Sequence, residues 1–145
     1  MTYTSLDITQ GFEGYSSVPY RCPAGVWTIG WGATAGLDGK PVTAETAPVS
    51  QDEAQALLLR ELNQCVKAVG RLINVPLSQG QFDALVDFVF NLGAGALQRS
   101  TLRAVVNRED HAAAPDEFLK WCKAGGRVLL GLLKRRQVEV ALYVS

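Results

Sequence analysis

The stretch EGYSSVPYRCPAGVWTIGWG, residues 13–32, places a Glu, a Cys and a Thr in and around a segment with the composition of a β-hairpin. β-branched and aromatic residues broken by prolines and glycines continue to Val42, so Tyr20 to Val42 is predicted to form a small antiparallel sheet. Cys22 and Thr28 are equally spaced along the chain about Gly25. A tight hairpin centred there would set the two side chains opposite each other across two strands.

The segment before this hairpin is predicted to be a short helix. Residues 5 to 13, SLDITQGFE, have Ser5 as a possible N-cap and Gly14 as the C-terminal stop. Glu13 then lies at the negative end of the helix dipole, which favours the protonated form of a carboxyl group and suits a general acid. Most glutamates at helix ends are ordinary surface residues, so position alone leaves both interpretations open.

The remainder of the chain has helical patterning. Residues 50–53, SQDE, form a capping-box sequence, and the apolar residues behind it recur at helical spacing as far as Ile73. One long amphipathic helix is therefore predicted over about 51–75, ended by Pro76. Further helices are predicted for Ser78 to Gly93, about Ser100 to Asn107, about His111 to Lys123, and about Leu132 to Tyr143.

The predicted fold class is α+β, mainly α, in a single domain spanning residues 1–145. About 12–50 would form a small β-containing lobe, about 51–75 a long linking helix, and about 76–145 a helical C-terminal lobe. No internal repeat, low-complexity tract or linker divides the chain. A cleft between two lobes would accommodate a long polymeric substrate.

Composition and charge exclude several classes of function. The 14 basic and 14 acidic side chains balance, which does not indicate a nucleic-acid partner. Three widely spaced cysteines and one His support neither a metal site nor a disulfide framework, and no cofactor is implied. No N-terminal stretch is long and apolar enough for a signal peptide or membrane anchor, so no stable membrane insertion is expected. A monomer is expected because no large apolar stripe is left over.

Five segments in order resemble one known family. The Glu, Cys and Thr spacing with IGWG is followed by ALVDFVFNLGAGAL at 84–97, STL at 100–102, FLKWCKAGG at 118–126 and GLLKRRQVEVALY at 131–143. Together they resemble the phage-type lysozymes of glycoside hydrolase family 24. The resemblance implies a two-lobed lysozyme-like fold and cleavage of the β-1,4 bond between N-acetylmuramic acid and N-acetylglucosamine in bacterial peptidoglycan.

The resemblance also implies catalytic roles. Glu13 matches the general acid that protonates the leaving glycosidic oxygen, and Thr28 matches a residue that helps hold the attacking water. Cys22 stands where the family usually has the Asp that activates this water, although some phage lysozymes carry Cys there. An unperturbed thiol is mostly neutral at pH 7, so activity should depend on a shifted Cys22 pKa or on alkaline pH. Alternatively, Cys22 is a small buried residue in a degenerate site.

Other positions follow the family pattern less closely. Phe90, Asn91 and Thr101 match positions where the helical lobe lines the sugar-binding cleft, and Thr34 matches the end of the strand on the other side. Plain core packing is an equally good interpretation of Phe90.

Charged positions show one match and one departure. Arg135 or Arg136 resembles the basic residue that pairs with the catalytic Glu across the cleft. Where the family often reads Gly-His-Thr, this chain has Gly32-Ala33-Thr34, so an ion pair made by that His is absent. The lone His111 lies in a polar region and is expected to be a solvated surface residue.

These observations favour a soluble bacteriophage endolysin, a bacteriolytic muramidase synthesised in the host cytoplasm. It would act on peptidoglycan in the periplasm or cell wall after release through a separate holin. The alternatives are a non-catalytic peptidoglycan-binding protein with a degenerate lysozyme site, and a chitin-type glycoside hydrolase. A weaker hypothesis is redox control, in which Cys22 forms a disulfide with Cys65 or Cys122, which otherwise read as core residues.

Overall fold

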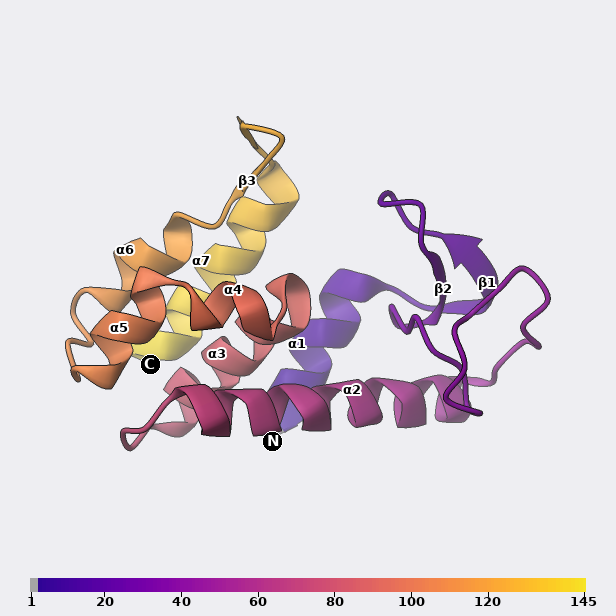
Figure 1. Cartoon of the computed structure of the whole chain (residues 1–145), viewed down its shortest axis with the longest axis horizontal. Coiled ribbons are helices and arrows are strands. Elements are labelled where there is room, and N and C mark those ends of the chain that lie inside the picture. The colour runs from indigo at the N-terminus through magenta and orange to yellow at the C-terminus, as the bar shows by residue number, and fades with distance from the viewer. Residues whose placement is uncertain (1–2) are drawn as a thin grey trace. The chain divides into compact units, whose positions relative to one another are not determined.

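The computed structural model describes residues 3–145, with side chains described from Leu6 onward. It contains two compact units: an N-terminal unit, Leu6–Asn63, and a helical unit, Gln64–Ser145 together with the first turn of the helix α1 (Tyr3–Glu13). One boundary falls within α1 and the other within α2 (Gln51–Leu72), so both helices contribute to both units (Figure 1). Whether the two units act as the predicted single domain stays a prediction.

The first helix begins earlier than expected. α1 spans Tyr3–Glu13, so Ser5 lies inside the helix and its prediction as the N-cap is wrong. The reason is that neither Tyr3 nor Thr4 is a Pro or Gly that would oppose helical geometry. The end of the helix agrees with the prediction. Gly14 has φ +67° and donates its N–H to the carbonyl of Gln10 at 3.2 Å.

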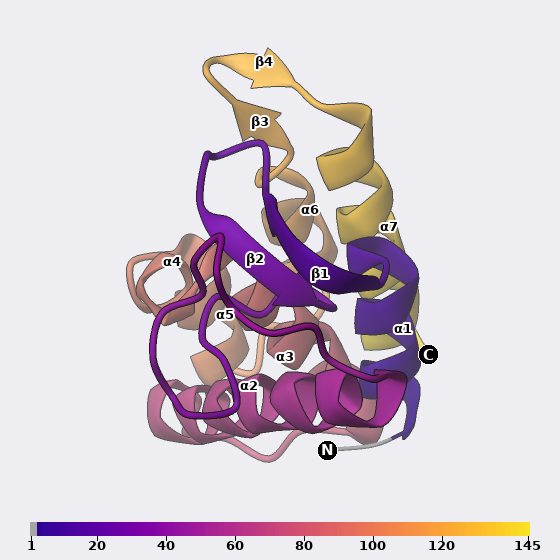
Figure 2. The same ribbon diagram turned by 90° about the vertical axis from the view of Figure 1, so that its right-hand side faces the viewer.

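A two-stranded antiparallel hairpin forms the sheet of the N-terminal unit (Figure 2). β1 (Ser16–Arg21) pairs with β2 (Trp27–Gly30), and isolated bridges and turns continue from there to Pro41. The predicted antiparallel structure is present, but its regular part is shorter than Tyr20 to Val42. Gly30 and Gly32 have φ values of +66° and +85° and turn the chain back on itself directly after β2.

The predicted pairing of Cys22 with Thr28 is wrong by two residues along the strand. Thr28 is paired with Tyr20, whereas the Cys22 N–H bonds to the carbonyl of Val26 at 3.0 Å. The physical reason is the turn. Gly25 adopts φ +78° and donates to the Cys22 carbonyl at 2.8 Å, so the loop comprises residues 23–25 and is centred before Gly25.

The hairpin packs on the first half of α2. The core of the N-terminal unit consists of Ile29, Ala33, Val42, Val49, Ala54 and Leu57, with Trp27 and Trp31 packed against it. The predicted capping box is confirmed, because Ser50 and Glu53 exchange hydrogen bonds of 3.0 and 3.1 Å at the start of the helix. Arg60 donates to the carbonyls of Ala35 and Gly36, which fixes the loop after the hairpin to α2.

The helical unit contains five more helices and a second hairpin. They are α3 (Gln79–Leu92), α4 (Ala94–Gln98), α5 (Thr101–Asn107), α6 (Ala114–Leu119), β3 (Lys123–Ala124), β4 (Arg127–Val128) and α7 (Leu130–Val144). α3 packs against α7, which also packs against α6. Gly80 lies where α3 meets α7, because a Cβ there would collide with the carbonyl oxygen of Leu142. The predicted capping box of α3 is confirmed at Ser78 and Gln81.

The helix predicted from about His111 to Lys123 is the poorest prediction in this unit. Regular helix is limited to α6, and Lys123 begins β3 instead of ending a helix. Gly125 and Gly126 explain the difference, because their φ values of +59° and +78° form the tight turn of the second hairpin. His111 is also not simply solvated, because its Nδ1 lies 2.6 Å from the hydroxyl of Tyr143. Burial raises the pKa of Tyr143 to about 12.

The predicted fold class, α+β and mainly α with a small antiparallel sheet, is confirmed. Among the helices of the described residues, none is both long enough and apolar enough to cross a membrane.

Candidate active site

The side chain of Glu13 rests on the turn that follows β2. A Cβ on Gly32 would lie 3.0 Å from Glu13 Oε2 and 3.3 Å from its Cδ, so the carboxyl group occupies the space that glycine leaves. This turn is held by two backbone hydrogen bonds of 2.8 and 2.9 Å exchanged between Ile29 and Ala33. The partly buried Glu13 carboxyl group therefore packs against the backbone of a turn whose conformation is fixed by hydrogen bonds.

One face of the first hairpin gathers polar side chains. Tyr20 and Cys22 are two residues apart and point to the same side, and Thr28 joins them because it pairs directly with Tyr20. Thr28 is 3% exposed and donates its hydroxyl proton to the carbonyl of Val26 at 2.9 Å. The predicted residues Cys22 and Thr28 are thus on a common face, as diagonal and not direct neighbours.

The partly exposed thiol of Cys22 has a lowered pKa. Hydrogen bonds from the backbone of Val26 and then of Ala24 lower its pKa from the ordinary value, partial burial opposes them, and the Thr28 hydroxyl adds a smaller lowering. The hairpin turn therefore shifts the pKa of Cys22 in the direction that a working thiolate needs.

Tyr20 belongs to the same group, although the sequence pattern did not single it out. The pKa of its phenol is raised, first by burial and then by the negative charges of Glu13 and Cys22. Tyr20 therefore lies within electrostatic reach of both groups and keeps its proton beside them. The sequence could have indicated this position, because Tyr20 lies two residues before Cys22 and residues two apart on a strand share a face.

A second missed residue is Glu61 of α2, whose side chain is partly buried. Burial raises the pKa of Glu61 and the charge of Glu13 adds to this, whereas a hydrogen bond from the Thr34 backbone and the charge of Arg60 oppose it. Thr34 itself is exposed at the end of the turn. Ala33, which stands where the resemblance implies a His, is buried.

The predicted residues of the helical unit gather between α3 and α7. Arg135 donates from Nε and Nη2 to the two carboxylate oxygens of Asp87, at 2.9 and 2.8 Å, and both side chains are buried. The guanidinium carbon of Arg135 lies 5.9 Å from the centre of the half-buried Phe90 ring. Arg135 is thus held in one orientation by a bidentate ion pair and an aromatic ring.

Arg136 is buried beside Arg135 and has its own partners. Its Nη2 donates to Asn91 Oδ1 at 2.7 Å and to Glu139 Oε2 at 2.9 Å. Its Nε also lies 2.7 Å from Glu139 Oε1, but these two atoms are not aligned for a hydrogen bond, so the Nη2 bond fixes the pair. The predicted pairing of Arg135 or Arg136 with Glu13 stays a prediction.

Asp87 and Glu139 are buried acids that sequence analysis missed. Burial would raise the pKa of Asp87, but hydrogen bonds from Glu139 and Arg135 and the two guanidinium charges hold it below its usual range. Burial, together with the hydrogen bond and charge of Asp87, raises the pKa of Glu139 well above its usual range. Two features of the sequence could have indicated these buried acids. Asp87 interrupts the apolar run of α3, and Glu139 lies three residues after Arg136 on the same helix face.

The remaining predicted residues lie apart from these contacts. Thr101 is exposed in the first turn of α5. Cys122 is buried, as predicted for a core residue, whereas Cys65 is partly buried. A disulfide from Cys22 to either residue stays a prediction. In the part of the chain that the structure describes, no three His, Cys, Asp or Glu side chains gather where they could hold a metal ion.

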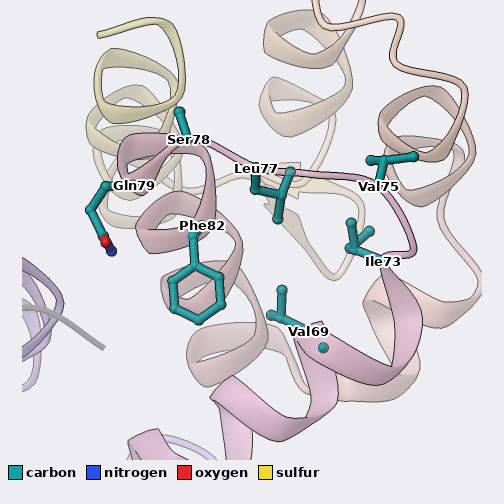
Figure 3. A pocket seen from close by; sticks show the side chains of 8 residues that line it. Val69, Ile73, Val75, Leu77, Ser78, Gln79 and Phe82 are labelled. Carbon is teal, nitrogen blue, oxygen red and sulfur yellow. The ribbon is translucent and has the colours of Figure 1, made fainter.

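An open pocket in the helical unit does not have the chemistry of an active site. Val69 of α2 and Ile73, which directly follows this helix, face Phe82 of α3 across it (Figure 3). The other residues that line it are Gly70, Val75, Leu77, Ser78 and Gln79. The lining contains no acid or base of the kind that acid–base catalysis requires.

A carboxyl group supported at a helix end, close to a hairpin face that gathers a thiol and two hydroxyl groups, fits the glycoside hydrolases, which cleave sugar polymers by acid–base catalysis. Comparisons with known proteins define the family. A model of the phage lysozyme family matches residues 10–139. The chain therefore belongs to the phage lysozyme family, which confirms the predicted resemblance and the predicted glycoside hydrolase activity.

Individual relatives agree with this family. The endolysin of Acyrthosiphon pisum secondary endosymbiont phage 1 is 40% identical over 144 residues, which cover 97% of this chain and 94% of that protein. The SAR-endolysin of Escherichia phage Mu is 39% identical over 131 residues, 90% of this chain and 73% of that protein. The solved endolysin from Escherichia coli O157:H7 phage FAHEc1 matches with a TM-score of 0.90 and 32% identity over 99% of this chain and 92% of that chain.

Proposed function

We propose that this chain is an endolysin that hydrolyses the β-1,4 bond between N-acetylmuramic acid and N-acetylglucosamine in peptidoglycan, with Glu13, Cys22 and Thr28 as its catalytic residues. The observation that carries this proposal is the support of the Glu13 carboxyl group on Gly32, in electrostatic reach of the hairpin face that holds Cys22. The family membership of the chain supports the substrate class.

The proposed reaction is a single displacement with inversion at the anomeric carbon. Protonated Glu13 gives its proton to the glycosidic oxygen while the bond from that oxygen to the anomeric carbon breaks. Water held by Thr28 and Cys22 attacks the opposite face of the sugar, and its proton passes to the Cys22 thiolate. Glu13 is left as a carboxylate and Cys22 as a thiol, and proton exchange with solvent restores both.

We assign supporting roles to the other predicted residues. Thr34 would contact the sugar chain beside the first hairpin, and Phe90, Asn91 and Thr101 would contact it beside the helical unit. Arg135, held by Asp87, would form the ion pair with Glu13, and Arg136 would keep Asn91 in place through its 2.7 Å hydrogen bond.

Product analysis tests the proposed reaction. Purified Gram-negative sacculi would be digested with the whole protein, and the released fragments would be measured by mass spectrometry. We expect fragments that end in reducing N-acetylmuramic acid and carry one added water per cleavage. Fragments with a different sugar at the reducing end, or cleavage of chitin oligosaccharides in preference to sacculi, would contradict the proposed bond. Binding to sacculi without any release would favour a non-catalytic protein.

We also propose that the chain is synthesised in the host cytoplasm as a monomer and reaches the wall through a separate holin. Expression in Escherichia coli with and without a co-expressed holin tests this route, with culture turbidity as the readout. Lysis is expected when both proteins are present. Equally fast lysis by this chain alone would show that it reaches the wall without such a partner.

A further inference from the structure

A run of exposed residues joins the second hairpin to α7. Residues 123–131, KAGGRVLLG, are all exposed. Three of them are large aliphatic residues, namely Val128, Leu129 and Leu130, with exposed fractions of 52%, 44% and 73%. Isolated exposed aliphatic residues are ordinary on protein surfaces, but three in succession on one projecting element mark an interaction surface. Figures 1 and 2 show this hairpin projecting beyond the start of α7.

The same surface is positively charged. Lys123 and Arg127 lie on the two strands of the hairpin, and Lys134 lies one helical turn after Leu130 on the same side of α7. The sequence has no Asp or Glu between Glu117 and Glu139. Within the residues that the structure describes, these three cations form no ion pair. We call Lys123, Arg127, Val128, Leu129, Leu130 and Lys134 the hairpin patch.

Both faces of the hairpin combine a cation with aliphatic surface. The register pairs Lys123 with Val128, so these side chains share one face, while Arg127 points to the other face. Leu129 continues the strand, with its N–H bonded to the Cys122 carbonyl at 2.9 Å, and lies on the face of Arg127. Gly125 and Gly126 leave the tip without side chains. A flat, rigid partner would cover one face and leave the other in water.

We propose that the hairpin patch is a docking element for the surface of an anionic lipid bilayer. A fluid interface surrounds a narrow hairpin, so aliphatic side chains on both faces are buried while the cations stay among the lipid headgroups. Sugar chains are a poorer fit, because the hairpin patch has no aromatic side chain on which a sugar ring could stack. Anionic lipids supply the complementary charge. This membrane-surface contact is independent of the proposed hydrolysis.

Vesicle sedimentation tests the proposal. The whole protein would be mixed with phosphatidylethanolamine vesicles containing phosphatidylglycerol, and with vesicles in which phosphatidylcholine replaces the anionic lipid. We expect binding to the anionic vesicles, and this binding should weaken with salt because salt screens the charges. Each cation near such a surface strengthens binding about fivefold. The double variant Lys123→Glu, Arg127→Glu should therefore bind at least about twenty-five-fold more weakly. The double variant Leu129→Ser, Leu130→Ser should also lose binding.

Matched controls lie in the N-terminal unit. Leu37 is 54% exposed and Lys40 is also exposed, so Leu37→Ser and Lys40→Glu change similar groups outside the hairpin patch. Both controls should bind like the unchanged protein. The proposal is overturned if the unchanged protein does not bind anionic vesicles, or if patch and control variants bind equally. It is also overturned if the patch variants keep vesicle binding but lose binding to purified, lipid-free sacculi, which would assign the hairpin patch to the glycan.

Discussion

At the scale of single residues, Cys22 is the group on which the proposed chemistry depends most. Its lowered pKa increases the thiolate population below the usual titration range of a thiol. On the acidic limb of the pH profile, the rate should rise with pH as this thiolate forms. Cys22→Ser should lower kcat by roughly 10²-fold or more and remove that rise, because a hydroxyl does not ionise in this range. Cys22→Asp should stay active at lower pH, because a carboxylate is already ionised there.

Rates of sacculus clearing from pH 5 to 9 would check this prediction, with Cys65→Ser as a matched control for thiol removal. An unchanged pH profile in Cys22→Ser would mean that Cys22 is a passive residue in a site that works without it.

Gly32 gives a second prediction at this scale. Ala at this position would place its Cβ 3.0 Å from Glu13 Oε2 and would also strain a backbone with φ +85°. We expect Gly32→Ala to lower kcat roughly 10²-fold by displacing the carboxyl group. Gly39→Ala is the control, because Gly39 has φ +77° but nothing within 4 Å of an added Cβ. If both variants lose the same activity, backbone strain and not the position of Glu13 is the cause.

At the scale of elements, the ion pair between α3 and α7 should contribute strongly to stability. Asp87→Asn would remove the carboxylate that binds buried Arg135, and loss of one partner of a buried pair costs about 3 kcal/mol. The pair of Lys120 with Glu117 is equally short at 2.8 Å, but the Lys120 side chain is 65% exposed, so Glu117→Gln should cost less than about 1 kcal/mol. Urea unfolding of the three proteins would measure both values. Similar costs for the two variants would contradict the argument.

The same pair predicts how stability depends on pH. The folded pKa of Asp87 is lowered, so its contribution is present above its unfolded pKa and is lost as the pH falls through the folded value. The unchanged protein should therefore lose more stability on acidification below about pH 4 than Asp87→Asn does. Parallel stability curves for the two proteins would show that Asp87 does not carry this pH dependence.

Elements with local signals were predictable from the sequence, and those that depend on turn geometry were not. The caps at Ser50 and Ser78 are encoded by side chains within a few residues of each helix start. The register at Cys22 depended on whether the loop was centred on Gly25 or before it, and apolar patterning does not distinguish these cases. The hairpin after α6 was missed for a similar reason, because its two strands are too short to show alternation.

At the scale of the whole molecule, the fold class and family followed from five ordered segments spread along the chain. The groups around the site were harder to foresee. Tyr20 and Glu61 join the surroundings of Glu13 only through the hairpin and its packing on α2, and the pairing of Arg135 with Asp87 joins residues 48 positions apart. Long-range pairs of this kind are not visible in local periodicity.

The central claim is that this chain is a hydrolase whose activity requires Glu13. The most direct test is the rate at which the purified protein clears outer-membrane-permeabilised Gram-negative cells, measured beside Glu13→Gln. Glu13→Gln removes the proton donor and keeps the shape of the side chain, so clearing should fall by at least about 10²-fold. Clearing that persists in Glu13→Gln, or no clearing by either protein between pH 5 and 9 under reducing conditions, would contradict the account.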